Sequence, residues 1–165
     1  LINYLHKIGW FIGLVLLQVL ILNNVHIAGY ATPFLYIYLI LKFESDTPAM
    51  LDVVGIFLGL AVDVFSDTPG MNAAATVLLA FLRPTFLRLF VPRDTLDTLV
   101  PAIRTMGILP FLKYLVVSVL IHHGLLLTLE FFSFAHIGTL LLRIAASTLL
   151  TVTCIMAVEG IRKKG

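Results

Sequence analysis

The sequence predicts an all-α fold, a single integral membrane bundle of six transmembrane helices spanning residues 1–165. Three observations lead to this prediction. Hydrophobic residues make up 60% of the chain and charged residues 12%, whereas soluble domains carry about 25% charged residues. Six apolar segments are separated by Pro, Gly, Asn and Asp. Lys and Arg fall almost entirely at one set of alternating ends of these segments.

Each segment approaches the ~20 apolar residues that a helix needs to cross a bilayer. The spans are expected over 4–22, 32–43, 49–65, 69–90, 108–129 and 138–161. The first, which we expect to be retained as a span, stops at Asn23 and Asn24. The second opens where Thr32 is placed to cap a helix and Pro33 suits its first position.

The remaining spans are also predicted from apolar segments and from the residues that begin or end a helix. The third follows Thr47 and Pro48, and the fourth begins near Pro69, with a kink or early end expected at Pro84. The fifth and sixth are long, continuous apolar runs. The short second and third segments could instead pair as a hairpin that does not cross, but the alternation of charge favours full crossing.

The distribution of basic residues predicts the sidedness of the bundle. Ten of the eleven Lys and Arg residues lie on one side if six helices cross: Lys7, Lys42, Arg83, Arg88, Arg93, Arg104, Lys113, Arg162, Lys163 and Lys164. The connections on the other side, 23–31, 66–69 and 130–137, contain none. Since cytoplasmic ends carry the Lys and Arg excess, both termini are predicted to be cytoplasmic.

The long connection over 93–107 has two interpretations that the sequence leaves open. Leu96, Leu99, Val100 and Ile103 follow helical spacing, which fits a short helix lying on the membrane surface. Pro101 weakens that pattern, and an irregular polar loop fits equally well. The basic residues on this side could meet anionic lipid or a cytosolic partner, or serve topology alone.

Two charged residues within the apolar spans are the sharpest anomalies. A charge at mid-membrane costs about 2.5–3.5 kcal/mol on insertion scales, so such residues usually face the bundle and have a partner. Asp63 lies near the end of the third span, and Arg143 lies inside the sixth at a similar depth. We predict that Arg143 pairs with Asp63 or with Glu130. The alternatives are that Asp63 reaches outer-face water or caps the turn along with Asp67, and that Arg143 extends to the membrane surface.

Small and polar residues predict where helices meet. Gly55 and Gly59 are four residues apart, a spacing that lets helix backbones approach closely. Pro69 and Gly70 suit a tight turn after the third span, and Asn72 follows it before three alanines. Gln18 in the first span is expected to form an interhelical hydrogen bond.

No motif in the sequence carries catalytic chemistry. The chain lacks a nucleophile-elbow, P-loop, zinc-protease or dinucleotide-binding signature. The adjacent His122 and His123 point about 100° apart and are expected to be satisfied within the bundle rather than to bind metal. The only cysteine is Cys154, and the net charge of +2 does not suggest nucleic-acid binding. We therefore expect no enzyme activity, no cofactor and no metal.

One stretch resembles a known family. Gly59-Leu-Ala-Val-Asp63-Val-Phe-Ser-Asp-Thr-Pro69-Gly70-Met-Asn72-Ala73 is similar to the Gly-Leu-x-x-Asp…Pro-x-Gly-x-Asn-Ala stretch of MreD, a bacterial rod shape-determining membrane protein. Gln18 and the Ile27-Ala-Gly29…Pro33 region give weaker support, and Phe34 stands where the family carries an acidic residue. The length and the six spans extend the resemblance over nearly the whole chain.

The resemblance implies a non-enzymatic scaffold subunit of the cell-elongation complex in the bacterial inner membrane. Its direct partner would be MreC, which would connect it with MreB filaments, the RodA glycosyltransferase and the partner transpeptidase. Membrane lipids and further copies of the chain are additional expected contacts. The family is also similar in fold to the substrate-binding subunits of energy-coupling-factor transporters. The alternative is therefore a vitamin-binding membrane subunit, which would need an outward-facing pocket with several convergent polar groups.

Overall fold

The structure is a computed structural model that describes residues 2–27, 29–43, 48–91, 99–132 and 136–164. These ranges are helical apart from turns, an extended segment and an isolated bridge between Ile27 and Ala31. The elements are α1 (Ile2–Leu20), a 3-10 turn η1 (Leu22–Asn24), α2 (Ile37–Lys42), α3 (Pro48–Ser66), α4 (Met71–Phe90), α5 (Ile103–Met106), α6 (Ile108–Phe131) and α7 (Ile137–Lys164).

Within the described part of the chain, five helices are long and apolar enough to cross a membrane, which confirms a helical membrane bundle. They are α1, α3, α4, α6 and α7, and their bounds lie within about three residues of the predicted spans. Pro84 lies inside α4 without ending it. The number of crossings and the cytoplasmic location of the termini stay predictions.

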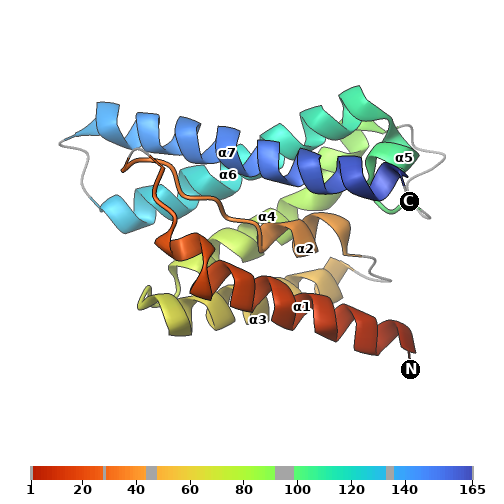
Figure 1. The fold of residues 1–165 in the computed structure, drawn as a ribbon, viewed down its shortest axis with the longest axis horizontal. Coiled ribbons are helices and arrows are strands. Elements are labelled where there is room, and N and C mark those ends of the chain that lie inside the picture. Colours follow the sequence, from red (N-terminus) through yellow and green to blue (C-terminus); the bar gives the residue numbers. More distant parts are fainter. Residues whose placement is uncertain (1, 28, 44–47, 92–98, 133–135, 165) are drawn as a thin grey trace.

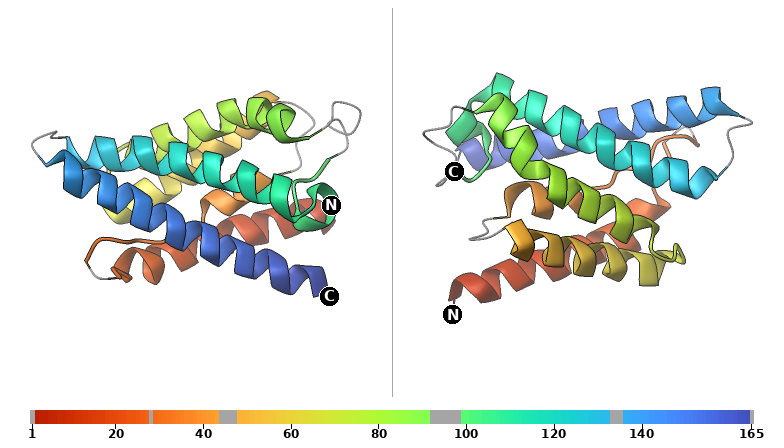
Figure 2. Two further views of the ribbon diagram at one scale, coloured as in Figure 1. Left: turned by 90° about the horizontal axis from the view of Figure 1, so that it is seen from above. Right: turned by 180° about the vertical axis from the view of Figure 1, so that it is seen from behind.

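The long helices run side by side between two ends of the molecule (Figure 1). The start of α1 and the end of α7 lie at the same end in all three views (Figures 1 and 2). We call this the terminal end and the opposite one the far end. Contacts join α3 to α4, α4 to α6, and α6 to α7, while α1 packs at the edge against α3 and α2.

The predicted second helix over 32–43 is wrong in its first half. The chain is not helical from Thr32 to Tyr36, and α2 has only six residues, a length of about 9 Å. Pro33 explains part of this result, because it has no backbone N–H and disfavours helical geometry at Thr32. The predicted cap by Thr32 is therefore absent.

Side chains from neighbouring helices satisfy the backbone of this extended segment. Ser147 Oγ accepts from Thr32 N (3.1 Å), and Thr151 Oγ1 accepts from Phe34 N (3.1 Å). Gln18 accepts from the N–H of residue 35 through Oε1 (2.9 Å) and donates through Nε2 to the carbonyl of residue 33 (3.0 Å). Non-helical backbone is tolerated within a membrane bundle only when such partners exist.

The end of α2 is closed by two side chains from other helices. Arg83 is 8% exposed and donates to the carbonyls of Leu41 (3.3 Å) and Phe43 (2.9 Å). Tyr114 Oη also donates to Leu41 (3.1 Å). A cation at a helix C-terminus is favourable, so Arg83 has a structural role in addition to any role in topology.

The long connection after α4 lies partly outside the described residues, which include neither Leu96 nor the rest of 92–98. Within the described part, residues 99–102 are not helical and α5 covers only Ile103–Met106. Of the two interpretations that the sequence leaves open, the described part shows one short helical turn after an irregular stretch, and Leu96 lies outside the described residues.

Candidate functional site

The turn between α3 and α4 is organised around one buried carboxylate. Asp63 is 4% exposed. Its Oδ1 accepts from the backbone N–H and the Nδ2 of Asn72 (2.9 Å each) and from Thr68 Oγ1 (2.8 Å), and its Oδ2 accepts from Ala73 N (2.9 Å). The two backbone donors are free N–H groups at the start of α4. Asp63 thus caps α4 from the neighbouring helix, where a negative charge also suits the helix dipole.

The backbone of this turn requires the residue types that the sequence places there. Gly70 has φ +79° immediately before α4, a conformation that a side chain disfavours. Pro69 precedes it in the tight turn, and Asp67 has φ +53°, which Asp tolerates better than most residues. The amide of Asn72 also donates to Thr68 Oγ1 (2.9 Å), so the turn is held from both sides.

Gly55 and Gly59 lie where α3 meets α4. A Cβ added at Gly59 would lie 2.3 Å from Ala73 Cα and 2.4 Å from Thr76 Oγ1. At Gly55 it would lie 3.2 Å from the carbonyl oxygen of Thr76, whose hydroxyl donates to the carbonyl of Gly55 (2.8 Å). The absence of both side chains allows this close approach.

A chain of buried polar groups leads from Asn72 across the bundle to α7. Tyr36 Oη donates to Asn72 Oδ1 (2.7 Å) and lies 2.9 Å from His122 Nε2. His122 Nδ1 is 3.4 Å from His123 Nδ1, and His123 Nε2 is 3.1 Å from Thr151 Oγ1. All five side chains are at most 4% exposed. Both histidines therefore have polar partners within the bundle.

Among the described residues, no three His, Cys, Asp or Glu side chains are placed to hold a metal ion. The contacts of His122 with Tyr36 and of His123 with Thr151 make the histidine pair part of a hydrogen-bonded core network. Such networks make a core specific when each member has a partner.

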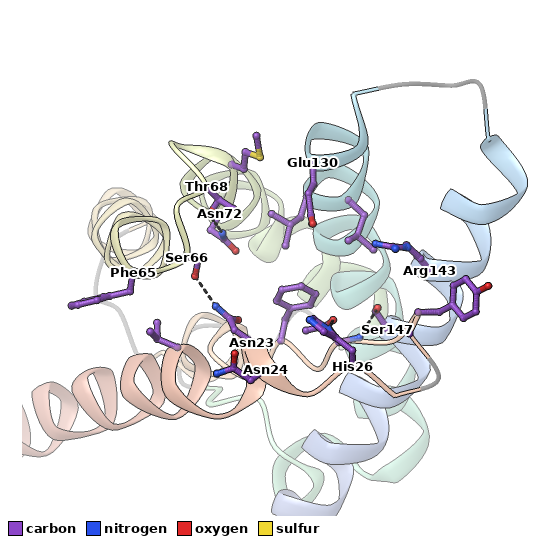
Figure 3. A pocket seen from close by; sticks show the side chains of 18 residues that line it. Asn23, Asn24, His26, Phe65, Ser66, Thr68, Asn72, Glu130, Arg143 and Ser147 are labelled. Carbon is purple, nitrogen blue, oxygen red and sulfur yellow. Dashed lines mark hydrogen bonds between the residues drawn. The ribbon is translucent and has the colours of Figure 1, made fainter.

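A cavity of about 470 Å³ opens at the far end, between η1, the extended segment, α6 and α7 (Figure 3). Its polar wall includes Asn23, which donates to Ser66 Oγ (2.6 Å) and accepts from Gln18 Nε2 (2.8 Å). His26, Glu130 and Arg143 also line it. The volume lies in the ~300–1,000 Å³ range of small-molecule sites.

The predicted ion pair of Arg143 with Asp63 or Glu130 is wrong. Asp63 is occupied by the turn, and Arg143 forms no hydrogen bond or ion pair with either carboxylate. Its Nε is buried without a hydrogen-bond partner, and its guanidinium lies over the Phe131 ring, 5.1 Å from the centroid. Thr68, Asn72 and Ala73 already supply four hydrogen bonds to the Asp63 carboxylate. Figure 3 shows Arg143 and Glu130 on neighbouring helices of the cavity wall.

The terminal end contains a charged cluster that the sequence analysis missed. Glu159 is 3% exposed and accepts from Lys42 Nζ (2.5 Å), from the Tyr38 hydroxyl and from Ile103 N (3.3 Å). Arg162 also donates to the Tyr38 hydroxyl (3.3 Å). Lys42–Glu159 is the ion pair that the structure records among the residues it describes. Glu159 is an acidic residue inside the last predicted span, and this position alone could have indicated that it has a buried partner.

Comparison of the chain with protein-family models, with curated proteins and with solved structures gave no match.

Proposed function

We propose that the chain is a non-enzymatic scaffold subunit of the bacterial cell-elongation complex, in the inner membrane. It binds MreC directly and, through it, couples MreB filaments to peptidoglycan synthesis by RodA and its partner transpeptidase. The proposal rests on the resemblance of residues 59–73 to the MreD stretch.

The observation that supports the proposal best is that the residues of 59–73 contact one another and form one structural unit. Asp63 caps α4, Gly70 supplies the required backbone conformation, and Asn72 binds the carboxylate. Gly59 lets α3 reach Ala73. The residues that carry the resemblance therefore work together, as expected of a family motif that builds one end of the bundle.

A scaffold also needs surfaces that other membrane proteins can reach, and the bundle offers one along α1. Within the apolar range Leu5–Asn24, which contains most of α1, only 17% of the most apolar stretch is buried inside the protein. Ile8, Ile12, Leu16 and Leu20 are between 46% and 66% exposed at intervals of four residues. This spacing forms one apolar stripe along the helix, which lipid or a single-span partner helix would cover.

The direct test is purification of the tagged full chain in mild detergent, followed by identification of the proteins that elute with it. We expect MreC with the wild type and with Asp67→Asn, a change on an exposed residue of the same turn. Asp63→Ala should lose MreC, because the end of the bundle is no longer held together. An elution without MreC from wild-type cells that contain it would contradict the proposal.

A second candidate function is supported by the far-end cavity. Its volume and polar wall match the outward-facing pocket that a small-molecule-binding transporter subunit would need. Mass spectrometry of small molecules released from the purified protein tests this candidate. A vitamin released from wild type but not from Arg143→Met, together with a co-eluting ATP-binding cassette pair, would favour it over the scaffold.

A further inference from the structure

The far-end cavity contains two opposite charges that the fold does not pair with each other. Among the described residues of its wall, Arg143 is the only Lys or Arg and Glu130 is the only Asp or Glu. They come from neighbouring helices, Glu130 near the end of α6 and Arg143 about 9 Å along α7 from its start. Figure 3 shows both side chains extending into the space between these helices. The structure nevertheless records no ion pair between them among the residues it describes.

Neutral polar groups of the same wall already have partners within the fold. Asn23 donates to Ser66 Oγ and accepts from Gln18 Nε2. His26 Nδ1 lies 3.0 Å from Thr32 Oγ1. These contacts hold the wall in place but use much of its hydrogen-bonding capacity. The two charged side chains are therefore the strongest groups that the cavity offers to a ligand.

Arg143 in particular lacks the acceptor that its charge requires. Its Nε is buried without a hydrogen-bond partner among the described residues, and its guanidinium lies 5.1 Å from the Phe131 ring centroid. A ring face attracts the cation but does not supply the carboxylate or phosphate oxygens that suit a guanidinium best. An oxyanion in the cavity would do so, because the planar guanidinium can bind it through two parallel hydrogen bonds.

The charge balance of the wall decides between classes of ligand. A simple anion that bound Arg143 would also face the carboxylate of Glu130, and a simple cation that bound Glu130 would face the guanidinium. Like charges brought together in a binding site cost free energy, so either ligand would satisfy one group at the expense of the other. A zwitterion satisfies both. The wall also includes Phe34, Leu126 and Leu127, which suit an apolar body on the same molecule.

We propose that the far-end cavity binds a small zwitterion, in which a short linker joins an ammonium group and an oxyanion on an apolar body. The oxyanion binds Arg143 in the deeper part of the cavity, and the ammonium binds Glu130 nearer the end of α6. An apolar amino acid and the headgroup of phosphatidylethanolamine both have this chemistry. The inference rests on the second candidate function only in that this cavity binds a ligand, and it requires no transport.

The first test varies the ligand and leaves the chain unchanged. Isothermal titration calorimetry of the wild-type full chain in mild detergent compares L-leucine and L-phenylalanine with their amides and their N-acetyl forms, which keep one charge each. Native mass spectrometry compares added phosphatidylethanolamine with phosphatidylglycerol, which has no ammonium. We expect each lost charge to weaken binding about tenfold or more, because charge-assisted hydrogen bonds are the strong ones. Binding of an amino acid identifies a free small molecule as the ligand, and binding of phosphatidylethanolamine alone identifies a lipid headgroup.

The second test varies the charges of the chain against matched controls. Arg143→Met removes the cation of the cavity, and Lys113→Met removes an exposed cation of α6 that does not line it. Glu130→Gln removes the carboxylate of the cavity, and Asp67→Asn neutralises an exposed acid that does not line it. We expect the two cavity variants to weaken binding of the zwitterion about tenfold or more and the two controls to change it less than about twofold.

The two tests combine into a pattern that a purely structural role of either residue would not give. Arg143→Met should no longer distinguish an amino acid from its amide. Glu130→Gln should no longer distinguish the amino acid from its N-acetyl form, or phosphatidylethanolamine from phosphatidylglycerol. All four variants should unfold near the wild-type temperature.

Two results would overturn the proposal outright. One is that neither the amino acids nor phosphatidylethanolamine bind to the wild type, and the other is that cavity and control variants lose binding equally. A vitamin bound in place of a zwitterion would also overturn it, while supporting the second candidate function.

Discussion

Asp63 and Arg143 are charged residues near the same end of the bundle, yet their surroundings differ. Asp63 accepts four hydrogen bonds, one from the turn that follows its own helix and three from the start of α4. The Nε of Arg143 is buried without a hydrogen-bond partner among the described residues, and Arg143 lines the far-end cavity. The difference separates a charge that the fold needs from a charge that the fold leaves available for something else.

The largest effect should come from removing the satisfied charge. Asp63→Ala leaves the N–H groups of Asn72 and Ala73 without their acceptor inside a membrane bundle, so we expect a loss of about 3–5 kcal/mol of unfolding free energy. Thermal or denaturant unfolding in mild detergent measures it. Asp67→Asn, at an exposed positive-φ position that Asn also tolerates, should change stability by less than about 0.5 kcal/mol.

The extended segment before α2 offers the next effect, because one amide side chain supports it. Gln18→Leu removes the acceptor of the N–H at residue 35 and the donor to the carbonyl at residue 33. We expect a loss of about 2–3 kcal/mol. The same unfolding assay tests it, and an unchanged midpoint would show that the segment does not depend on Gln18.

The contact between α3 and α4 should be sensitive to one added methyl group. Gly59→Ala would place Cβ 2.3 Å from Ala73 Cα, so the helices must separate at a cost of about 1–3 kcal/mol. Gly13→Ala is the matched control in a helix with open space, and we expect it to stabilise by about 0.5–1 kcal/mol. Equal effects of both changes would argue against close packing at Gly59.

The smallest effect on stability is expected at the unsatisfied charge. Arg143→Met keeps much of the side-chain length but removes the guanidinium, which lies over the Phe131 ring and whose Nε has no hydrogen-bond partner. Stability should change by less than about 0.5 kcal/mol or rise slightly. A loss above about 2 kcal/mol in the unfolding assay would reveal a structural partner for Arg143.

Much of the bundle could be predicted from hydropathy alone, because long apolar runs have no other stable state in a bilayer. The second span could not be predicted in this way. Its extended half depends on side chains at Gln18, Ser147 and Thr151, which are far apart in the sequence. An apolar segment indicates that its residues are buried. It does not indicate which side chains from distant parts of the sequence will form hydrogen bonds with its backbone.

The sequence predicted which residues form the candidate site better than it predicted which groups those residues contact. The importance of Asp63, Gly70 and Asn72 followed from charge, turn chemistry and the family resemblance. The pairing of Asp63 with Arg143 was wrong, because similar depth in a membrane does not fix the distance between two helices. Glu159 was missed, since its partners Tyr38 and Lys42 come from the other end of the chain.

A double-mutant cycle of Asp63→Asn and Arg143→Met tests the independence of the two charges most directly. Unfolding free energies of the wild type, both single variants and the double variant are measured in the same detergent. We expect the two changes to add to within about 0.5 kcal/mol, because the residues share no contact. A coupling energy above about 1 kcal/mol would show that the charges interact and would contradict the separation between a structural carboxylate and an available guanidinium.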